Sequence, residues 1–172
     1  RFFTVYIFIL IVIIIIIYFG LIFRQRKKVE MASYPKEFEG TWAMDKAQSE
    51  DADAMLSAQG VGWMKRKVIA ASSVTVTISG DGNKVIIKTE TTFSTKVNEW
   101  TLGEEVDQEN PVLGNVKAVL TVEGNKIINV MKNENGVTTV VRSVEGDKLI
   151  SEGKFEPTKG ETVTLKRIYV KQ

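Results

Sequence analysis

The sequence predicts an all-β protein, a ten-stranded antiparallel up-and-down β-barrel with a short helix–turn–helix lid. From Ser73 onward apolar and polar residues alternate with a period of two, as in Val74, Val76 and Ile78. Turn signals then recur at nearly even intervals to the end of the chain, with two helical stretches near its start. Many short sequential strands close most naturally into a barrel, which leaves few exposed edges. A two-sheet sandwich is the structural alternative.

The turn signals are clusters of glycine, asparagine, aspartate and proline between β-branched runs. They lie at residues 80–83, 109–111, 123–125, 135–136, 145–147 and 157–160. A less clear break near residues 97–98 completes a count of about ten strands.

The first elements precede this alternation. We expect a strand over residues 38–46, opened by Gly40. A helix should follow, with Ser49 as its N-cap and acidic residues in its first turn. Gly60 is a natural stop for that helix, and residues 62–70 predict a second one.

Residues 1–30 are predicted to form a leader separate from a barrel domain over 31–172. No charge occurs from Phe2 to Phe23, a run long enough for a helix to cross a bilayer, and basic residues follow it at 24–28. The positive-inside tendency would place the barrel on the cytoplasmic side. The alternative is an untranslated stretch translated in frame, with Met31 as the true start.

The charges and missing residue types exclude several function classes. Residues 1–30 hold five of the 23 basic side chains and one of the 21 acidic ones, so the remainder carries 18 basic and 20 acidic residues and no excess positive charge for nucleic acid. The chain contains no histidine and no cysteine. Since these are the usual general base, nucleophile and metal ligands, we expect no enzyme, no metal and no cofactor.

Two predicted strands carry an arginine on a face shared with apolar residues. Arg142 shares a face with Val140, and Arg167 shares one with Leu165 and Tyr169. Alternation leaves open whether these faces point to solvent or into a barrel. An inward guanidinium needs an anion, and a carboxylate matches its planar fork, with a tyrosine hydroxyl as a further contact. A fatty acid is the simplest molecule with one carboxylate and a tail suited to apolar walls.

Residues 34–172 resemble the intracellular fatty-acid-binding proteins, which are cytosolic lipid-binding proteins of the calycin superfamily with a lipocalin-like β-barrel, and the related retinoid-binding proteins. No single motif is decisive, but their order and spacing are specific. They are FEGTW at 38–42, GVGWMKRKV at 60–68, TF at 92–93, LGEEVD at 102–107, TTVVR at 138–142 and RIY at 167–169.

The resemblance implies that Arg142, Arg167 and Tyr169 bind the carboxylate of a ligand. It also implies a portal and lid, whose residues are Phe93, Trp63, Met64, Lys65, Arg66 and Lys67. Trp63 and Met64 are expected either to contact the ligand or, preferably, to pack between lid and barrel. Lys65, Arg66 and Lys67 are interpreted either as a docking patch for anionic membranes or as a solvated helix face.

The expected function is non-covalent binding and intracellular transport of long-chain fatty acids by a cytoplasmic monomer, which contacts anionic membranes transiently. If the leader is translated, the barrel would be tethered to a membrane on its cytoplasmic side. Two alternatives remain open. One is a retinoic-acid-type carrier of the same fold, since both arginines argue for a carboxylate and retinol-binding members tend to carry glutamine there. The other is a membrane-tethered interaction module without lipid transport.

Overall fold

The computed structural model of the protein describes residues 33–172, so the leader and the membrane span predicted over residues 1–30 lie outside the described residues. Within residues 33–172, no helix combines the length and apolar character needed to cross a bilayer. A 3₁₀ turn, η1 (Lys36–Phe38), precedes the first strand, and two short helices, α2 (Asp53–Ala58) and α3 (Trp63–Ala71), separate the first strand from the second. The ten strands are β1 (Gly40–Asp45), β2 (Val74–Asp81), β3 (Lys84–Thr91), β4 (Thr95–Thr101), β5 (Glu105–Asn110), β6 (Gly114–Glu123), β7 (Lys126–Asn133), β8 (Gly136–Glu145), β9 (Lys148–Pro157) and β10 (Val163–Lys171).

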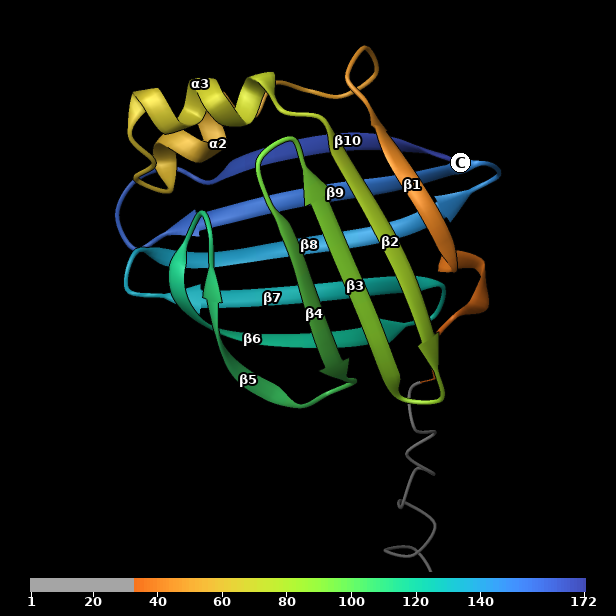
Figure 1. The fold of residues 1–172 in the computed structure, drawn as a ribbon. Helices are drawn as coiled ribbons and strands as arrows, with labels where there is room; N and C mark the ends of the chain where they lie inside the picture. The colour runs from red at the N-terminus through yellow and green to blue at the C-terminus, as the bar shows by residue number, and fades with distance from the viewer. Residues whose placement is uncertain (1–32) are drawn as a thin grey trace, which may run out of the picture. The chain divides into compact units, whose positions relative to one another are not determined.

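The strands form one continuous antiparallel sheet that curls into a barrel (Figure 1). Its order is β4-β3-β2-β1-β10-β9-β8-β7-β6-β5, so the first and last strands pair, with Trp42 opposite Lys171. This order confirms the predicted up-and-down barrel and excludes two separate sheets. The order ends at β4 on one side and β5 on the other, where the Lys96 ammonium donates a hydrogen bond to the Glu109 carbonyl oxygen.

Two local predictions were wrong. Ser49 does not cap α2, which begins at Asp53 without a side-chain cap; the Ser49 hydroxyl instead exchanges hydrogen bonds with the backbone of Ile168 in β10. The neighbouring Glu50 exchanges hydrogen bonds with the backbone of Lys166. The segment after β1 thus supplies hydrogen-bond partners for backbone groups of β10 that β1 does not reach. The predicted break near residues 97–98 lies inside β4, because the turns that bound β4 fall at 92–94 and 102–104.

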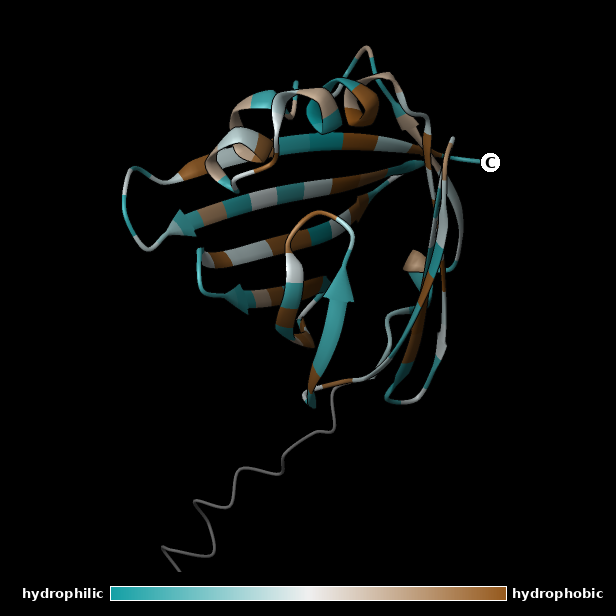
Figure 2. Ribbon diagram, turned by 60° about the vertical axis from the view of Figure 1, so that its left-hand side comes forward, coloured by the Kyte–Doolittle hydropathy of each residue, from teal (hydrophilic) through white to brown (hydrophobic). Residues whose placement is uncertain are grey.

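Buried and more exposed residues alternate along most strands. Figure 2 shows the corresponding bands of hydrophobic and hydrophilic residues. Trp42, Phe38 and Ile78 are completely buried near the β2–β3 hairpin, which Figure 1 shows at the end of the barrel opposite the helices. The Trp42 indole donates a hydrogen bond of 2.9 Å to the Phe38 carbonyl oxygen, which satisfies its buried N–H. This end of the barrel is therefore filled by aromatic and aliphatic side chains.

The helices α2 and α3 cover the other end (Figure 1). Ala52, Leu56 and Val61 form a small apolar cluster there, against which Leu165 of β10 packs. The Met55 side chain lies over Gly153 of β9, where a methyl group would stand 3.5 Å from the Met55 Cε atom. The helix–turn–helix lid predicted from the sequence is thus seated on β9 and β10.

Gly136 at the start of β8 lies so close to the end of β9 that a side chain at this position would clash with it. Its φ is 152°, and a Cβ atom there would lie 2.8 Å from the Pro157 Cα atom. We expect Gly136→Ala to lower the free energy of unfolding by about 1–3 kcal/mol, from strain in a conformation that L residues rarely adopt. Urea denaturation measures this.

Gly62 provides the matched control for Gly136→Ala. It precedes α3 with a φ of −58°, and a Cβ atom added there would have no heavy atom within 4 Å. Gly62→Ala loses only the advantage that glycine has over alanine as the N-cap of α3, so it should lower the unfolding midpoint less than Gly136→Ala does. Equal destabilisation by the two substitutions would contradict the steric argument.

Candidate functional site

Two arginines and a serine lie in one row across three neighbouring strands. Arg142 of β8 is paired with Ser151 of β9, which is paired in turn with Arg167 of β10. Directly paired residues project from the same face of a sheet, and strands lie about 4.8 Å apart, so the two arginine Cα atoms are separated by roughly 10 Å. Arginine side chains are long enough to approach a common ligand across that gap.

Arg142 faces the interior, because its cross-strand neighbour Ile127 is completely buried. Its Nη1 atom is inaccessible and has no hydrogen-bond partner. Burial lowers the pKa of the guanidinium, and the nearby Tyr169 opposes this shift. Arginine nevertheless stays protonated in proteins. The barrel interior therefore holds a positive charge, and no ion pair among residues 33–172 neutralises it.

Tyr169 follows Arg167 on the same face of β10. It is buried and lies opposite Leu149 of β9 and Met44 of β1. The structure thus brings together Arg142, Arg167 and Tyr169, and it settles the orientation that alternation left open in favour of the interior.

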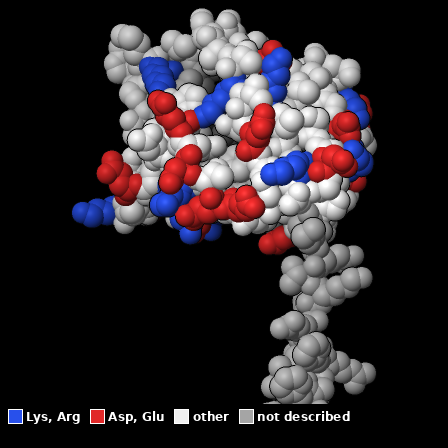
Figure 3. All heavy atoms as spheres, turned by 60° about the horizontal axis from the view of Figure 1, so that its bottom comes forward, with Lys and Arg blue, Asp and Glu red and all other residues white. Residues whose placement is uncertain are grey.

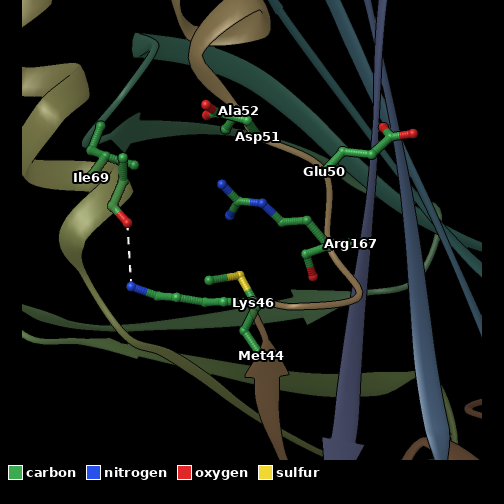
Figure 4. A pocket seen from close by; sticks show the side chains of 9 residues that line it. Met44, Lys46, Glu50, Asp51, Ala52, Ile69 and Arg167 are labelled. Carbon is green, nitrogen blue, oxygen red and sulfur yellow. Dashed lines mark hydrogen bonds between the residues drawn. The ribbon is translucent and has the colours of Figure 1, made fainter.

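Arg167 borders two hollows. One, of about 260 Å³, lies between the end of β1, the segment before α2 and the C-terminal part of α3. Figure 4 shows the Arg167 guanidinium extending into this hollow, while the Glu50 carboxylate points away from it. The Lys46 ammonium, also in this hollow, donates to the carbonyl oxygens of Ala70 and Ala71 at the end of α3. These bonds occupy the ammonium of Lys46, the other basic residue that lines this hollow.

The second hollow has a volume of about 400 Å³ and leads from the lid toward Arg167. Its walls come from α3, from the inward faces of β3 and β4, and from the β3–β4 and β5–β6 turns. Phe93 in the β3–β4 turn borders this hollow and is 68% exposed. Phe93 thus lies at the opening of this hollow, between α3 and the rim of the barrel.

The predicted lid residues have separate contacts. Arg66 is directed back to α2, where it pairs with the Asp53 carboxylate at 2.9 Å and donates to the Val61 carbonyl oxygen. Lys65 reaches across the opening to the Pro111 carbonyl oxygen, and Lys67 is exposed. The three basic residues therefore do not form one uniform patch.

The preferred prediction that Trp63 and Met64 pack between lid and barrel was wrong. Each side chain is 66% exposed at the start of α3. The first turn of α3 therefore faces solvent, and the apolar cluster between lid and barrel is formed instead by Leu56 of α2, by Ala52 and Val61 on either side of that helix, and by Ile69.

Several interior polar residues were not identified from the sequence. Asn129 of β7 and Thr138 of β8 are buried, and the Gln59 amide of the lid donates to the Thr138 hydroxyl at 3.3 Å. Strand alternation with Ile127 and Met131 could have placed Asn129 on the inward face. Gln59 carried no comparable signal, because it follows the last turn of a short helix.

Figure 3 shows one face of the molecule, on which acidic and basic side chains are interspersed rather than separated by sign. That face offers no continuous positive surface of the kind that binds a phosphate backbone. In contrast to this mixed surface, the inward-facing arginines Arg142 and Arg167 place charge of one sign inside the barrel.

A model of the lipocalin / cytosolic fatty-acid binding protein family matches residues 39–168. The chain belongs to this family. It is 36% identical over 115 residues to a fatty acid-binding protein type 3 of Fasciola hepatica, covering 66% of this chain and 86% of that protein. It is 33% identical over 103 residues to a liver fatty acid-binding protein of Lethenteron camtschaticum, covering 60% of this chain and 90% of that protein.

Solved structures of family members agree with this assignment. The fatty acid binding protein of Schistosoma mansoni, solved in complex with arachidonic acid, superimposes with a TM-score of 0.68 at 30% sequence identity. The match covers 78% of this chain and 96% of that one. The family's fold is therefore present in this member from the first strand to the last.

We predict that Arg142→Met stabilises the protein when no ligand is bound. The substitution removes an uncompensated buried charge and retains most of the side-chain volume, so the free energy of unfolding should rise by about 1 kcal/mol or more. Urea denaturation of delipidated protein provides the measurement. Lys126→Met, at an exposed position on β7, removes the same charge outside the barrel and should have little effect. A loss of stability in Arg142→Met alone would contradict the prediction.

Proposed function

We propose that this chain binds a long-chain fatty acid non-covalently inside the barrel and transports it in the cytoplasm, with the carboxylate on Arg142, Arg167 and Tyr169. The observation that carries the proposal is the buried Nη1 atom of Arg142, which has no hydrogen-bond partner in the protein. A ligand carboxylate would supply both an acceptor and a negative charge for this group.

The geometry of the row supports one anion rather than two. Arg142 and Arg167 flank Ser151, which lies between them in the pairing of β8, β9 and β10. A single carboxylate with two oxygens can accept from both guanidinium groups and from the Tyr169 hydroxyl.

Apolar walls suit the remainder of such a ligand. Val74 lines the hollow that leads to Arg167, and Val76 and Ile87 are buried on the inward faces of β2 and β3. Each methylene group transferred from water to this interior would contribute about 0.8 kcal/mol. The relatives named as fatty acid-binding proteins, and the one solved with arachidonic acid, support the same class of ligand.

Binding without chemistry fits the residues available. The sequence has no histidine and no cysteine, and the candidate site consists of two permanently protonated guanidinium groups, a phenol and an alcohol. Such groups hold an anion, but none is a base that works near neutral pH.

The displacement of a fluorescent fatty acid tests this proposal. We expect an unlabelled long-chain fatty acid to displace the probe at one equivalent, and the double variant Arg142→Gln, Arg167→Gln to bind at least about tenfold more weakly, because charge-assisted hydrogen bonds contribute about 1.5–3 kcal/mol each. Lys126→Gln, which removes a charge outside the barrel, should bind as the unaltered protein does.

The same titration separates the alternatives. Tighter displacement by retinoic acid than by any fatty acid would favour the retinoid carrier. Displacement undiminished in the double variant would refute the carboxylate site. The absence of any saturable lipid binding would favour an interaction module.

A second candidate activity, transient contact of the lid with anionic membranes, is favoured by the surface of α3. Trp63, Met64 and Val68 are exposed apolar residues, and Lys65 and Lys67 lie between them. Aromatic and aliphatic side chains flanked by lysines suit the interface of an anionic bilayer. This surface borders the opening next to Phe93, through which a ligand would pass.

We expect Lys65→Gln, Lys67→Gln to slow the transfer of a fluorescent fatty acid to vesicles that contain phosphatidylserine, since a lysine near an anionic surface contributes about 1 kcal/mol. Transfer to phosphatidylcholine vesicles should not change. Lys126→Gln, Lys154→Gln changes the net charge equally on the barrel wall and should leave both rates as they are. Equal slowing by the two double variants would show that only net charge matters.

A further inference from the structure

One polar amide lies in the barrel wall at a position where a ligand with a purely hydrocarbon chain would need no polar partner. Asn129 of β7 projects inward and is only 7% exposed, and its Oδ1 atom has no hydrogen-bond partner. Its direct cross-strand neighbours are Leu120 of β6 and Val140 of β8. An unpaired amide oxygen among such neighbours is costly, whereas a leucine would fill the position without that cost.

Two further polar groups lie beside Asn129. Thr138 of β8 is its diagonal neighbour, because Val140 is opposite Asn129 and Thr138 precedes Val140 on the same face. The Thr138 hydroxyl accepts a hydrogen bond from the Gln59 amide at 3.3 Å, and both residues are buried. The Thr138 hydroxyl proton remains available to a further acceptor.

From this arrangement we propose that Asn129, Thr138 and Gln59 form a second polar subsite, which binds a hydroxyl group on the hydrocarbon chain of the ligand. A hydroxyl can donate to the unpaired Oδ1 of Asn129 and accept from Thr138 or from an amide N–H. The ligand class is therefore a monohydroxylated long-chain fatty acid. The inference rests on the fatty-acid binding proposed above and extends it to a preference among fatty acids.

The register places this subsite at a defined distance from the carboxylate. Thr138 and Arg142 are four residues apart on the inward face of β8, a separation of about 13 Å. Asn129 is the diagonal neighbour of Arg142 as well, since Arg142 lies opposite Ile127. The hydroxyl that fits is accordingly several carbons from the carboxylate, and a hydroxyl beside the carboxylate would not reach it.

Binding by stearate and by a series of stearates that differ only in the carbon bearing one hydroxyl tests the inference. We expect the unaltered protein to bind at least one mid-chain isomer about tenfold more tightly than stearate, because a site that pairs with a hydroxyl discriminates against a ligand that lacks it. Asn129→Leu should lose this preference and still bind stearate. Thr138→Val, which keeps the side-chain shape, should reduce the preference for the same isomer over stearate.

Asn98→Leu is the matched control, because Asn98 also borders the interior but lies on β4 near the opening. It should keep the preference for the mid-chain isomer. Equal affinity for stearate and every isomer in the unaltered protein would overturn the subsite, as would a preference that survives in Asn129→Leu. Binding of neither stearate nor any isomer would instead refute the fatty-acid proposal itself, so the two failures are distinct.

Discussion

The positive charge of Arg142 inside the barrel is the constraint on which the rest of the site depends. A guanidinium without a counter-ion is unfavourable in an apolar interior, and the surrounding strands supply no carboxylate to neutralise it. The structure tolerates this because the ten-stranded sheet holds β8 in place by pairing on both sides. The fold therefore maintains an uncompensated charge at one point of the interior, and under the proposed function the sign and shape of that charge define the head group of the ligand.

The lid and the barrel wall then determine what else a ligand encounters. Arg66 fixes α3 to α2 through Asp53, so the two helices are joined to each other by a salt bridge as well as by apolar contacts. Gln59 joins the lid to the wall through Thr138, inside the barrel. The hollow between α3 and the β3–β4 turn is bordered by both Phe93 and Arg167, and its walls belong to the lid as well as to the barrel.

The strand pattern allowed most of the fold to be predicted from the sequence, because period-two alternation and glycine-containing turns are local signals. The Ser49 prediction failed because a tertiary contact, the bond to the β10 backbone, replaced the local capping role. The inward orientation of Arg142 could not be derived from alternation, since both faces of its strand carry valine; it depends on pairing with Ile127 and Ser151. Asn129 was missed for a different reason: alternation with Ile127 and Met131 indicates its inward face, but only the structure shows that its amide oxygen has no hydrogen-bond partner.

The pairing of β1 with β10 has a consequence for how the molecule forms. Trp42 and Lys171 are neighbours in the sheet although nearly the whole domain separates them along the chain. The barrel therefore cannot close during synthesis until its last strand has left the ribosome, and β1 presents an unpaired edge until then. Contacts of such long sequence separation also favour slow folding. The interaction that completes the cavity is consequently among the last that the nascent chain can make.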